Sequence, residues 1–416
     1  MAEIREIVAE VNKCPVDRNS IPQPLLNVEN KKRTSVFPWR GQFTPKLIEI
    51  LLTYYSHSDA VVLDPFAGSG TVLFEAARKR LECYGTEINP AAIEIAKLSQ
   101  FVNIKIDKRV ECIRRARDTI NRVVGDGSLP SFIDNKRQHS KKSLSFEEAF
   151  VETVKMAPDE QTRTLIICTF MRSIGSKSKD LFDAFAKQVK VVREMPYSPK
   201  PCRPFLCDAR ALPFEDESID LVITSPPYIN VFNYHQNYRR LMELLGWNIL
   251  YIAKSEIGSN RKHRQNRFLT VIQYCLDMLQ ALCEMRRIIK PDGRVIIVIG
   301  RESKIRGISF ENYKILSALA IGGGFKLICR QERGYINRFG ERITEDIIHL
   351  IPVKDEKPKP DYKLASDIAK YFLEDALNKA EGDIKEDIAS AISQVNVVHP
   401  SPILRPEKAR KKEQLY

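Results

Sequence analysis

Apolar residues in the first part of the chain alternate between short runs typical of buried strands and longer stretches with the spacing of one helix face. The expected strands and helices there are 43–55, 60–64, 71–80, 81–87 and 90–101. Pro45 and Pro90 stand at the first position of two of the helices, where a proline loses no helical hydrogen bond. Strands that alternate with helices predict a doubly wound α/β sheet.

The same alternation returns in the second half of the chain. The expected strands are 203–208, 218–225, 293–300, 325–331 and 344–352, and the expected helices are 236–246, 269–289 and 309–320. The run from Gly293 to Gly300 is almost continuously apolar, as in a strand buried on both faces of a parallel sheet. We therefore expect this run to be a central strand.

Between these two parts the pattern changes to charged, helix-forming stretches at 110–124, 146–156 and 162–173. About a hundred residues exceed an ordinary connection between a helix and a strand, so a helical insertion is predicted. After 352 we expect one amphipathic helix and, at 408–412, a disordered basic tail. The expected division is an N-terminal arm at 1–33, one half of the sheet domain at 34–104, the insertion at 105–202, the other half at 203–352 and a charged extension at 353–416.

Composition narrows the class of protein. The chain has 416 residues, 43% of them hydrophobic, and its net charge of +13 favours a polyanionic partner. No apolar run reaches the roughly 20 residues of a membrane helix, and the charged N-terminus does not resemble a secretory signal, so we expect a cytoplasmic protein. The nine cysteines are scattered without the paired spacing of a zinc site, so no metal is expected.

The strongest chemical signal is the sequence Asp64-Pro-Phe-Ala-Gly-Ser-Gly-Thr71, which follows a predicted strand and opens a predicted helix. Glycines let the backbone close around a ligand, and a helix N-terminus offers N–H groups to a carboxylate or phosphate. A dinucleotide site is the alternative, but the spacing is not that of GxGxxG and no Gly-Lys-Ser/Thr follows. Glu87 ends the next strand, where a carboxylate can accept hydrogen bonds from ribose hydroxyls. Its alternative role is to cap the helix at Pro90, for which Asn89 is the better candidate.

A second motif, Thr224-Ser-Pro-Pro-Tyr228, lies where the fourth predicted strand reaches the carboxyl edge of the sheet. Two prolines fix the backbone, so the Ser225 hydroxyl and the Pro226 carbonyl can both face an amino group. Tyr228 offers a flat face to a base. Taken alone, the motif is as consistent with a rigid turn whose tyrosine covers the core.

Together, the glycine loop and the Ser-Pro-Pro-Tyr motif resemble the amino-methyltransferase family of DNA methylases, especially its cytosine-N4 branch. The resemblance covers roughly 34–104 and 203–352, and it includes the segments 229–234, 287–293, 322–325 and 345–348. It implies a Rossmann-like domain that uses S-adenosyl-L-methionine, acts on DNA and belongs to a restriction-modification system, with a possible cognate restriction endonuclease. It makes 34–104 the cofactor-binding half and 203–352 the catalytic half.

The resemblance also assigns cofactor-binding roles. Phe43 and Thr44 would hold the methionine part, and Asp208 and Ala209 would flank the adenine, although Phe43 could be a core residue and Asp208 a turn residue. The loop itself would be formed by Asp64, Phe66, Gly68, Gly70 and Thr71, with Glu87 at the ribose.

The implied reaction is a direct displacement in which the amine attacks the sulfonium methyl group. Ser225 and Pro226 would accept the hydrogens of the amine, Pro227 would fix the backbone and Tyr228 would stack on the base, which in duplex DNA must be flipped out. Methylation of cytosine C5 through Cys202 is excluded because this cysteine precedes the third strand instead of following the fourth.

Basic residues near these motifs are candidates for phosphate contacts, with solvated loops as the alternative. The candidates after the second motif are Lys254, Arg261, Lys262, Arg264 and Arg267, and those around the last hairpin are Arg333, Arg338 and Arg342. In the insertion, Lys136, Arg137, Lys141 and Lys142 lead us to expect a helical subdomain that helps to clamp DNA, with a stabilising cap as the alternative.

Three other functions stay open. The first is methylation of adenine N6, against which Ser225 argues because many such enzymes have Asp before Pro-Pro. The second is an RNA methyltransferase acting on a guanine or adenine amine, although we expect too little chain before Phe43 for a separate RNA-binding domain. The third is a non-catalytic nucleic-acid-binding subunit. Four intact motif residues argue against it, namely Gly68, Gly70, Ser225 and Tyr228.

Overall fold

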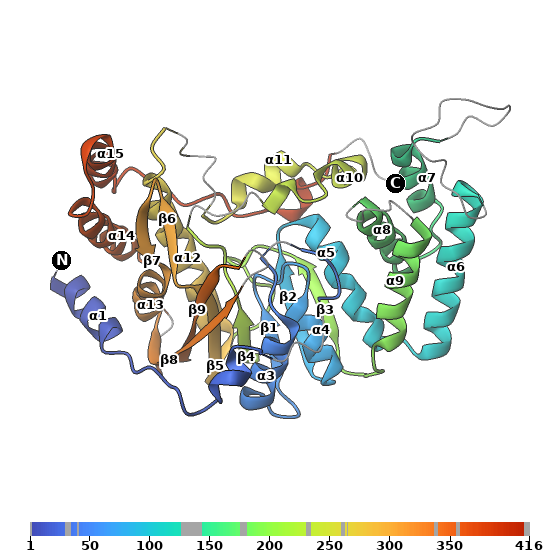
Figure 1. Ribbon diagram of the computed structural model, residues 1–416, viewed down its shortest axis with the longest axis horizontal. Helices are drawn as coiled ribbons and strands as arrows, with labels where there is room; N and C mark the ends of the chain where they lie inside the picture. The colour runs from blue at the N-terminus through green and yellow to red at the C-terminus, as the bar shows by residue number, and fades with distance from the viewer. Residues whose placement is uncertain are drawn as a thin grey trace.

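A seven-stranded sheet forms the centre of the computed structural model, with helices on both faces and a group of helices beyond one edge (Figure 1). The structure describes residues 2–29, 35–39, 41–125, 144–174, 181–229, 234–258, 263, 265–336, 340–354 and 358–411. None of the helices in these ranges is long and apolar enough to cross a membrane.

The strands of the central sheet follow the order β3-β2-β1-β4-β5-β9-β8. Their bounds are β1 Val61–Asp64, β2 Glu82–Glu87, β3 Cys202–Leu206, β4 Ile219–Thr224, β5 Ile289–Gly300, β8 Phe325–Ile336 and β9 Arg342–Pro352. The first five strands run parallel, whereas β9 is antiparallel to β5 and β8. The chain runs outward from β1 to β3 and returns at β4, so β1 and β4 flank the point where the strand order reverses. This topology confirms the predicted Rossmann-like α/β fold.

Alternate residues of the central strands point to opposite faces, as a two-residue period requires. Val62 and Leu221 belong to the core on one face, and Leu63 and Val222 to the core on the other. The first face is covered by α3 (Pro45–Tyr55), α4 (Thr71–Arg78), α5 (Pro90–Ala96) and the 3-10 helix η1 (Lys97–Asn103). The second is covered by α12 (Leu269–Ile288) and α13 (Asn312–Gly322), with α1 (Ala2–Asn12), α14 (Tyr362–Leu377) and α15 (Gly382–Ser393) outside them.

Between η1 and β3 the described residues form four helices, which lie beyond the β3 edge of the sheet (Figure 1). They are α6 (Ile106–Val124), α7 (Phe146–Lys155), α8 (Glu160–Ile174) and α9 (Leu181–Glu194). The last was not predicted, although Leu181, Phe185 and Val189 are buried at four-residue spacing along it. The fully buried Arg109 donates to the carbonyls of Ile104 and Val192 and so ties α6 to α9.

The remaining elements are short. They are α2 (Gln23–Leu26), η2 (Tyr234–Gln236), α10 (Arg239–Leu244), α11 (Ile249–Ile252), η3 (Ala253–Ser255), β6 (Glu302–Ile305), β7 (Ile308–Glu311) and η4 (Pro406–Lys408). The predicted helix at 309–320 begins only at Asn312, because Arg306 and Gly307 form a turn with positive φ that pairs β6 with β7.

The C-terminal extension differs from its prediction. It has two helices, α14 and α15, instead of one. The tail expected to be disordered is packed as far as Lys411, because Ala409 is fully buried and the Arg410 guanidinium stacks over Trp247 at 4.3 Å. In Figure 1 this red segment crosses above the sheet from α15 toward α10 and the helical insertion. The run of charged residues in this tail gave no indication in the sequence that Ala409 and Arg410 are packed.

Candidate active site

A crevice of about 950 Å³, open to solvent, lies at the carboxyl ends of β1 to β4. It is lined by the segments at the ends of these strands, at 65–69, 87–89 and 207–209, and by Ser225 and Pro227. Two further segments line it, Trp39 with 41–43 and Ser255 with Glu256 and Ile257. Open α/β sheets bind ligands at such an edge, beside the reversal of strand order.

The two glycines of the loop after β1 do different work. Gly70 has φ +85°, and a Cβ atom there would stand 2.9 Å from both Cα and Cβ of Ala96, so it is required by packing of α4 against α5. Gly68 has φ +51°, and a Cβ atom would meet only Trp39 Nε1 at 3.8 Å, on the side of the crevice. Because Gly70 is the cap residue of α4, no side chain caps the first turn, and its N–H groups remain for another acceptor.

Glu87 joins this loop to the next one. Its Oε2 accepts from the N–H of Gly68 at 2.9 Å and its Oε1 from the N–H of Asn89 at 2.8 Å. Asn89 in turn caps α5 by accepting from Ala91 N–H, as expected. Burial raises the pKa of Glu87 to about 7, against these hydrogen bonds and with a small contribution from the charge of Glu256. A backbone hydrogen bond from Ile88 also acts on this carboxylate and lowers its pKa.

Asp64 lies beneath the loop and does not line the crevice. Its Oδ1 accepts from the Thr224 hydroxyl at 2.6 Å and from Phe66 N–H at 3.0 Å. Asp64 is 1% exposed, and burial raises its pKa to about 7. The carboxyl group therefore ties the glycine loop after β1 to the Ser-Pro-Pro-Tyr motif after β4.

In that motif, Ser225 and Pro227 line the crevice and Pro226 is buried between them. The ring of Tyr228 lies against Gly300 at the end of β5, where an added Cβ would come within 3.0 Å of Tyr228 Cε2. A Cβ on Gly258 would come within 2.6 Å of the Tyr228 carbonyl oxygen. Two glycines distant in sequence thus make room for Tyr228.

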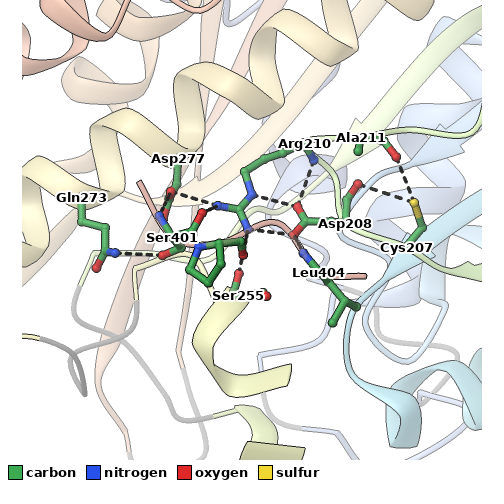
Figure 2. A network of polar contacts seen from close by, with 10 residues as sticks. Cys207, Asp208, Arg210, Ala211, Ser255, Gln273, Asp277, Ser401 and Leu404 are labelled. Atoms are coloured by element: carbon green, nitrogen blue, oxygen red, sulfur yellow. Dashed lines mark hydrogen bonds and ion pairs between the residues drawn. The ribbon is translucent and has the colours of Figure 1, made fainter. Parts of the chain in front are cut away.

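Most of the other predicted cofactor-binding residues line the crevice, but Thr44 does not. Phe43, Phe66, Thr71 and Ala209 line the crevice with Asp208. Thr44 does not; it precedes α3 at the cap position, without a side-chain cap hydrogen bond. The Asp208 carboxylate accepts four hydrogen bonds, three from Arg210 and one from Leu404 N–H (Figure 2).

The segment Ser255–Ile257, here called the crevice wall, was missed by the sequence analysis. Glu256 Oε1 accepts from His235 N–H at 2.8 Å, and Oε2 lies 2.7 Å from His235 Nδ1. His235 is 2% exposed and belongs to η2, which follows the Ser-Pro-Pro-Tyr motif along the chain. One sequence carries no signal for this contact, because it joins two irregular segments. Trp39 was also missed, although a tryptophan between proline and arginine just before a ligand-binding motif is a usable signal.

Only some of the residues predicted to contact phosphates lie in the part of the chain that the structure describes. Lys254, beside the crevice wall, and Arg267 are exposed. Arg333 is 3% exposed and forms an ion pair with Glu345 at 3.1 Å, so it is not free for a phosphate. Arg342 is exposed at the start of β9. The residues outside the described ranges are Lys136, Arg137, Lys141, Lys142, Arg261, Lys262, Arg264 and Arg338.

Comparisons with known proteins agree with this arrangement. A family model described as DNA methylase matches residues 17–98, which include α3, the glycine loop and Glu87. The type II methyltransferase M.AvaI of a Nostoc species is 22% identical over 284 residues, which are 55% of this chain and 57% of that protein. The type II methyltransferase M.MjaII of Methanocaldococcus jannaschii is 26% identical over 127 residues, 29% of this chain and 24% of that protein.

The chain therefore resembles DNA methylases over residues 17–98. It spans a little over half the length of M.AvaI. Among solved structures, a SAM-dependent methyltransferase from Methanosarcina mazei aligns over 73% of this chain and 97% of its own, at 13% identity and a TM-score of 0.33.

The chemistry of the crevice fits S-adenosyl-L-methionine. The uncapped first turn of α4 suits a carboxylate, and the space above Gly68 lets that carboxylate approach. The Glu87 carboxylate suits ribose hydroxyls, and Trp39, Phe43 and Ile257 supply apolar surface.

Proposed function

We propose that this protein methylates an exocyclic amine of a base in DNA, cytosine N4, with S-adenosyl-L-methionine as the methyl donor. The observation that carries the proposal is the 2.6 Å hydrogen bond from Thr224 to Asp64. It fixes the loop suited to the cofactor next to the motif suited to an amine, so that Ser225 lines the same crevice as Gly68.

The cofactor is assigned to the crevice as follows. The first turn of α4 and Gly68 bind the methionine carboxylate, and Phe43 packs on the methionine part. Glu87 accepts hydrogen bonds from the ribose hydroxyls. Ala209 packs on the adenine together with the backbone of Asp208, because protein donors already occupy the Asp208 carboxylate.

Ser225 and Pro226 act on the amine. The lone pair of an aromatic amine is delocalised into the ring, which makes the nitrogen a poor nucleophile. Acceptors placed for a tetrahedral nitrogen favour the transition state over the ground state. The Ser225 hydroxyl and the Pro226 carbonyl are these acceptors, and Tyr228 stacks on the base. When bound, S-adenosyl-L-methionine supplies a methyl group on a positively charged sulfur, which an amine attacks directly.

Cytosine N4 is proposed over adenine N6 because Ser225 stands where many adenine enzymes have Asp. A serine offers one neutral acceptor and no negative charge beside the base. The substitution Ser225→Asp therefore tests which base the crevice prefers.

DNA is proposed as the substrate because the matching family model is described as DNA methylase, and the similar proteins M.AvaI and M.MjaII are type II methyltransferases. The net charge of +13 and the exposed Lys254 beside the crevice wall agree with phosphate binding. A base reaches the crevice only when flipped out of the duplex. A restriction-modification system with a cognate endonuclease is the proposed setting.

Transfer of a labelled methyl group to duplex DNA and to structured RNA of equal phosphate concentration tests the substrate. We expect label in DNA alone, none with Gly68→Asp, and a steep loss of rate with rising salt. Label in RNA alone would overturn the proposal in favour of an RNA methyltransferase. Binding of cofactor and DNA without any transfer would favour a non-catalytic subunit.

A further inference from the structure

Two of the segments that line the crevice come from distant parts of the chain. Cys207, Asp208 and Ala209 follow β3, whereas the crevice wall Ser255–Ile257 starts at the last residue of η3. The side chain of Arg210 joins them. Its Nη2 donates to Asp208 Oδ2 at 2.7 Å and to the Ser255 carbonyl at 3.2 Å.

The same guanidinium also holds the C-terminal part of the chain. Its Nη1 donates to the Ser401 carbonyl at 2.9 Å and Nη2 to the Pro402 carbonyl at 3.0 Å. Figure 2 shows Arg210 at the centre of these contacts, between Asp208 and Asp277. We call residues Ser401–Lys411 the C-terminal strap.

The first end of the strap is bound by several further contacts. Ser401 N–H donates to Asp277 Oδ1 at 2.7 Å, and its hydroxyl accepts from Gln273 at 2.9 Å. Leu404 N–H donates to Asp208 Oδ2 at 2.9 Å, and the Leu404 side chain is 4% exposed. Asp208, which lines the crevice, is therefore a direct partner of the strap.

The second end is bound to the segment that leads into the crevice wall. Asn248 N–H donates to the Ala409 carbonyl at 2.8 Å, and Lys411 N–H donates to the Gly246 carbonyl at 2.9 Å. Arg410 stacks on Trp247 between these two contacts. Since α11 and η3 connect Asn248 to Ser255, the strap supports the crevice wall from both ends.

Charge makes this arrangement hard to rearrange. The side chain of Arg210 is fully buried, with Asp208 and Asp277 as its counter-charges. Burial raises the pKa of Asp277 to about 6, against the charge of Arg210. All five N–H groups of this buried guanidinium donate hydrogen bonds in the observed arrangement. If the strap moved away, some of these donors would be buried without an acceptor.

We propose that Arg210 is a positioning residue for the cofactor crevice and that the C-terminal strap is a structural part of the cofactor site. The strap holds Asp208 and the crevice wall at the spacing that S-adenosyl-L-methionine requires. Cofactor binding and docking of the strap are then coupled, and by reciprocity the cofactor must stabilise the docked strap as much as the strap stabilises cofactor binding. This inference rests on the cofactor-binding part of the proposed function.

Two substitutions in the full chain test the coupling. Leu404→Ala removes the buried anchor of the strap, and Arg210→Lys keeps the charge but removes the planar fork. Each is expected to weaken S-adenosyl-L-methionine binding on the order of tenfold by calorimetry and to raise its KM, with kcat at saturating cofactor nearly unchanged. The matched control is Leu373→Ala, in the fully buried part of α14 away from the crevice. It should lower Tm at least as much and leave cofactor affinity unchanged.

Hydrogen exchange of the unmodified protein gives a second test that does not depend on folding of the variants. Saturating cofactor should slow exchange of the Ser401, Leu404 and Lys411 amides, while the amides of α15 stay as they were. Unchanged strap exchange, or wild-type affinity in Leu404→Ala, would overturn the inference and leave the proposed function standing. Wild-type protein that binds no S-adenosyl-L-methionine would overturn both.

Discussion

The Thr224 hydroxyl donates a 2.6 Å hydrogen bond to Asp64, and both side chains are buried. Thr224 is the residue directly before Ser225, and Asp64 opens the glycine loop. The bond therefore sets the position of the proposed amine-binding motif relative to the cofactor. It also connects the ends of β1 and β4, the strands beside the reversal of the strand order.

Replacing Thr224 with valine keeps the shape of the side chain but leaves the buried Asp64 carboxyl with one donor fewer. We expect a loss of roughly 1–3 kcal/mol in the free energy of unfolding, measured with urea, and a slower methyl transfer. Thr224→Ser keeps the hydroxyl and should recover most of the transfer rate. Surface substitutions usually change the free energy of unfolding by no more than roughly 0.5 kcal/mol. A change no larger than this, together with normal turnover, would contradict the role of Thr224.

Gly68→Asp should abolish cofactor binding in a folded protein, because a carboxylate would fill and repel the place proposed for the methionine carboxylate. Gly382→Asp is the matched control, since Gly382 has a similar φ of +55° and no atom within 4 Å of an added Cβ. The control pays a comparable backbone strain and should bind the cofactor normally. Calorimetry on both proteins, with circular dichroism as the test of folding, decides the assignment; normal affinity in Gly68→Asp rejects it.

Ser225→Ala and Tyr228→Ala should lower kcat at least a hundredfold while cofactor affinity stays nearly intact, since both act on the base. Gly300→Ala offers a milder test, because its Cβ would come within 3.0 Å of the Tyr228 ring and displace it. It should slow transfer without affecting cofactor binding. Single-turnover rates at saturating cofactor measure these effects, and near-wild-type rates in Ser225→Ala would rule out the proposed acceptor.

Cofactor affinity should depend on pH through Glu87. The pKa of this carboxyl is raised to about 7, and only the ionised form accepts hydrogen bonds from both ribose hydroxyls. Below pH 7 a proton must leave before the cofactor binds, so affinity should rise by up to about tenfold per pH unit toward pH 7 and level off above it. Calorimetry between pH 5.5 and 8.5, values chosen roughly to bracket that pKa, measures the slope.

Two variants separate Glu87 from its neighbour of similar pKa. Glu87→Gln should bind more weakly and lose the pH dependence. Asp64→Asn should retain it, because Asp64 does not line the crevice. A slope that persists in Glu87→Gln would show that another group titrates on binding.

The sequence predicted the sheet and the two motifs because both depend on local signals. Apolar periodicity marks the central strands, and Gly68, Gly70 and the prolines of the second motif impose a backbone geometry that few other residues allow. The hairpin of β6 and β7 was not predicted, and the end of β7 was included in the predicted helix at 309–320, because its four-residue strands are shorter than the window that periodicity needs.

The contacts that complete the site are long-range and could not be predicted from a single sequence. Arg210 meets Ser401 across 191 positions of the chain, and Glu256 meets His235 across an irregular segment. Neither pair has a motif, and the strap carries a run of charges that normally indicates a solvated tail. The strap is held in place by burial of Leu404 and Ala409, and this burial can be seen only in the folded chain.

Mass spectrometry of the nucleosides from duplex DNA methylated by the purified protein tests the central claim most directly. We predict a labelled methyl group on the amine of deoxycytidine, N4-methyldeoxycytidine, with none formed by Ser225→Ala. N6-methyldeoxyadenosine would keep the reaction but correct the base. A methyl group on carbon, as in 5-methyldeoxycytidine, or the absence of any methylated nucleoside from DNA would show that the protein does not methylate an amine in DNA.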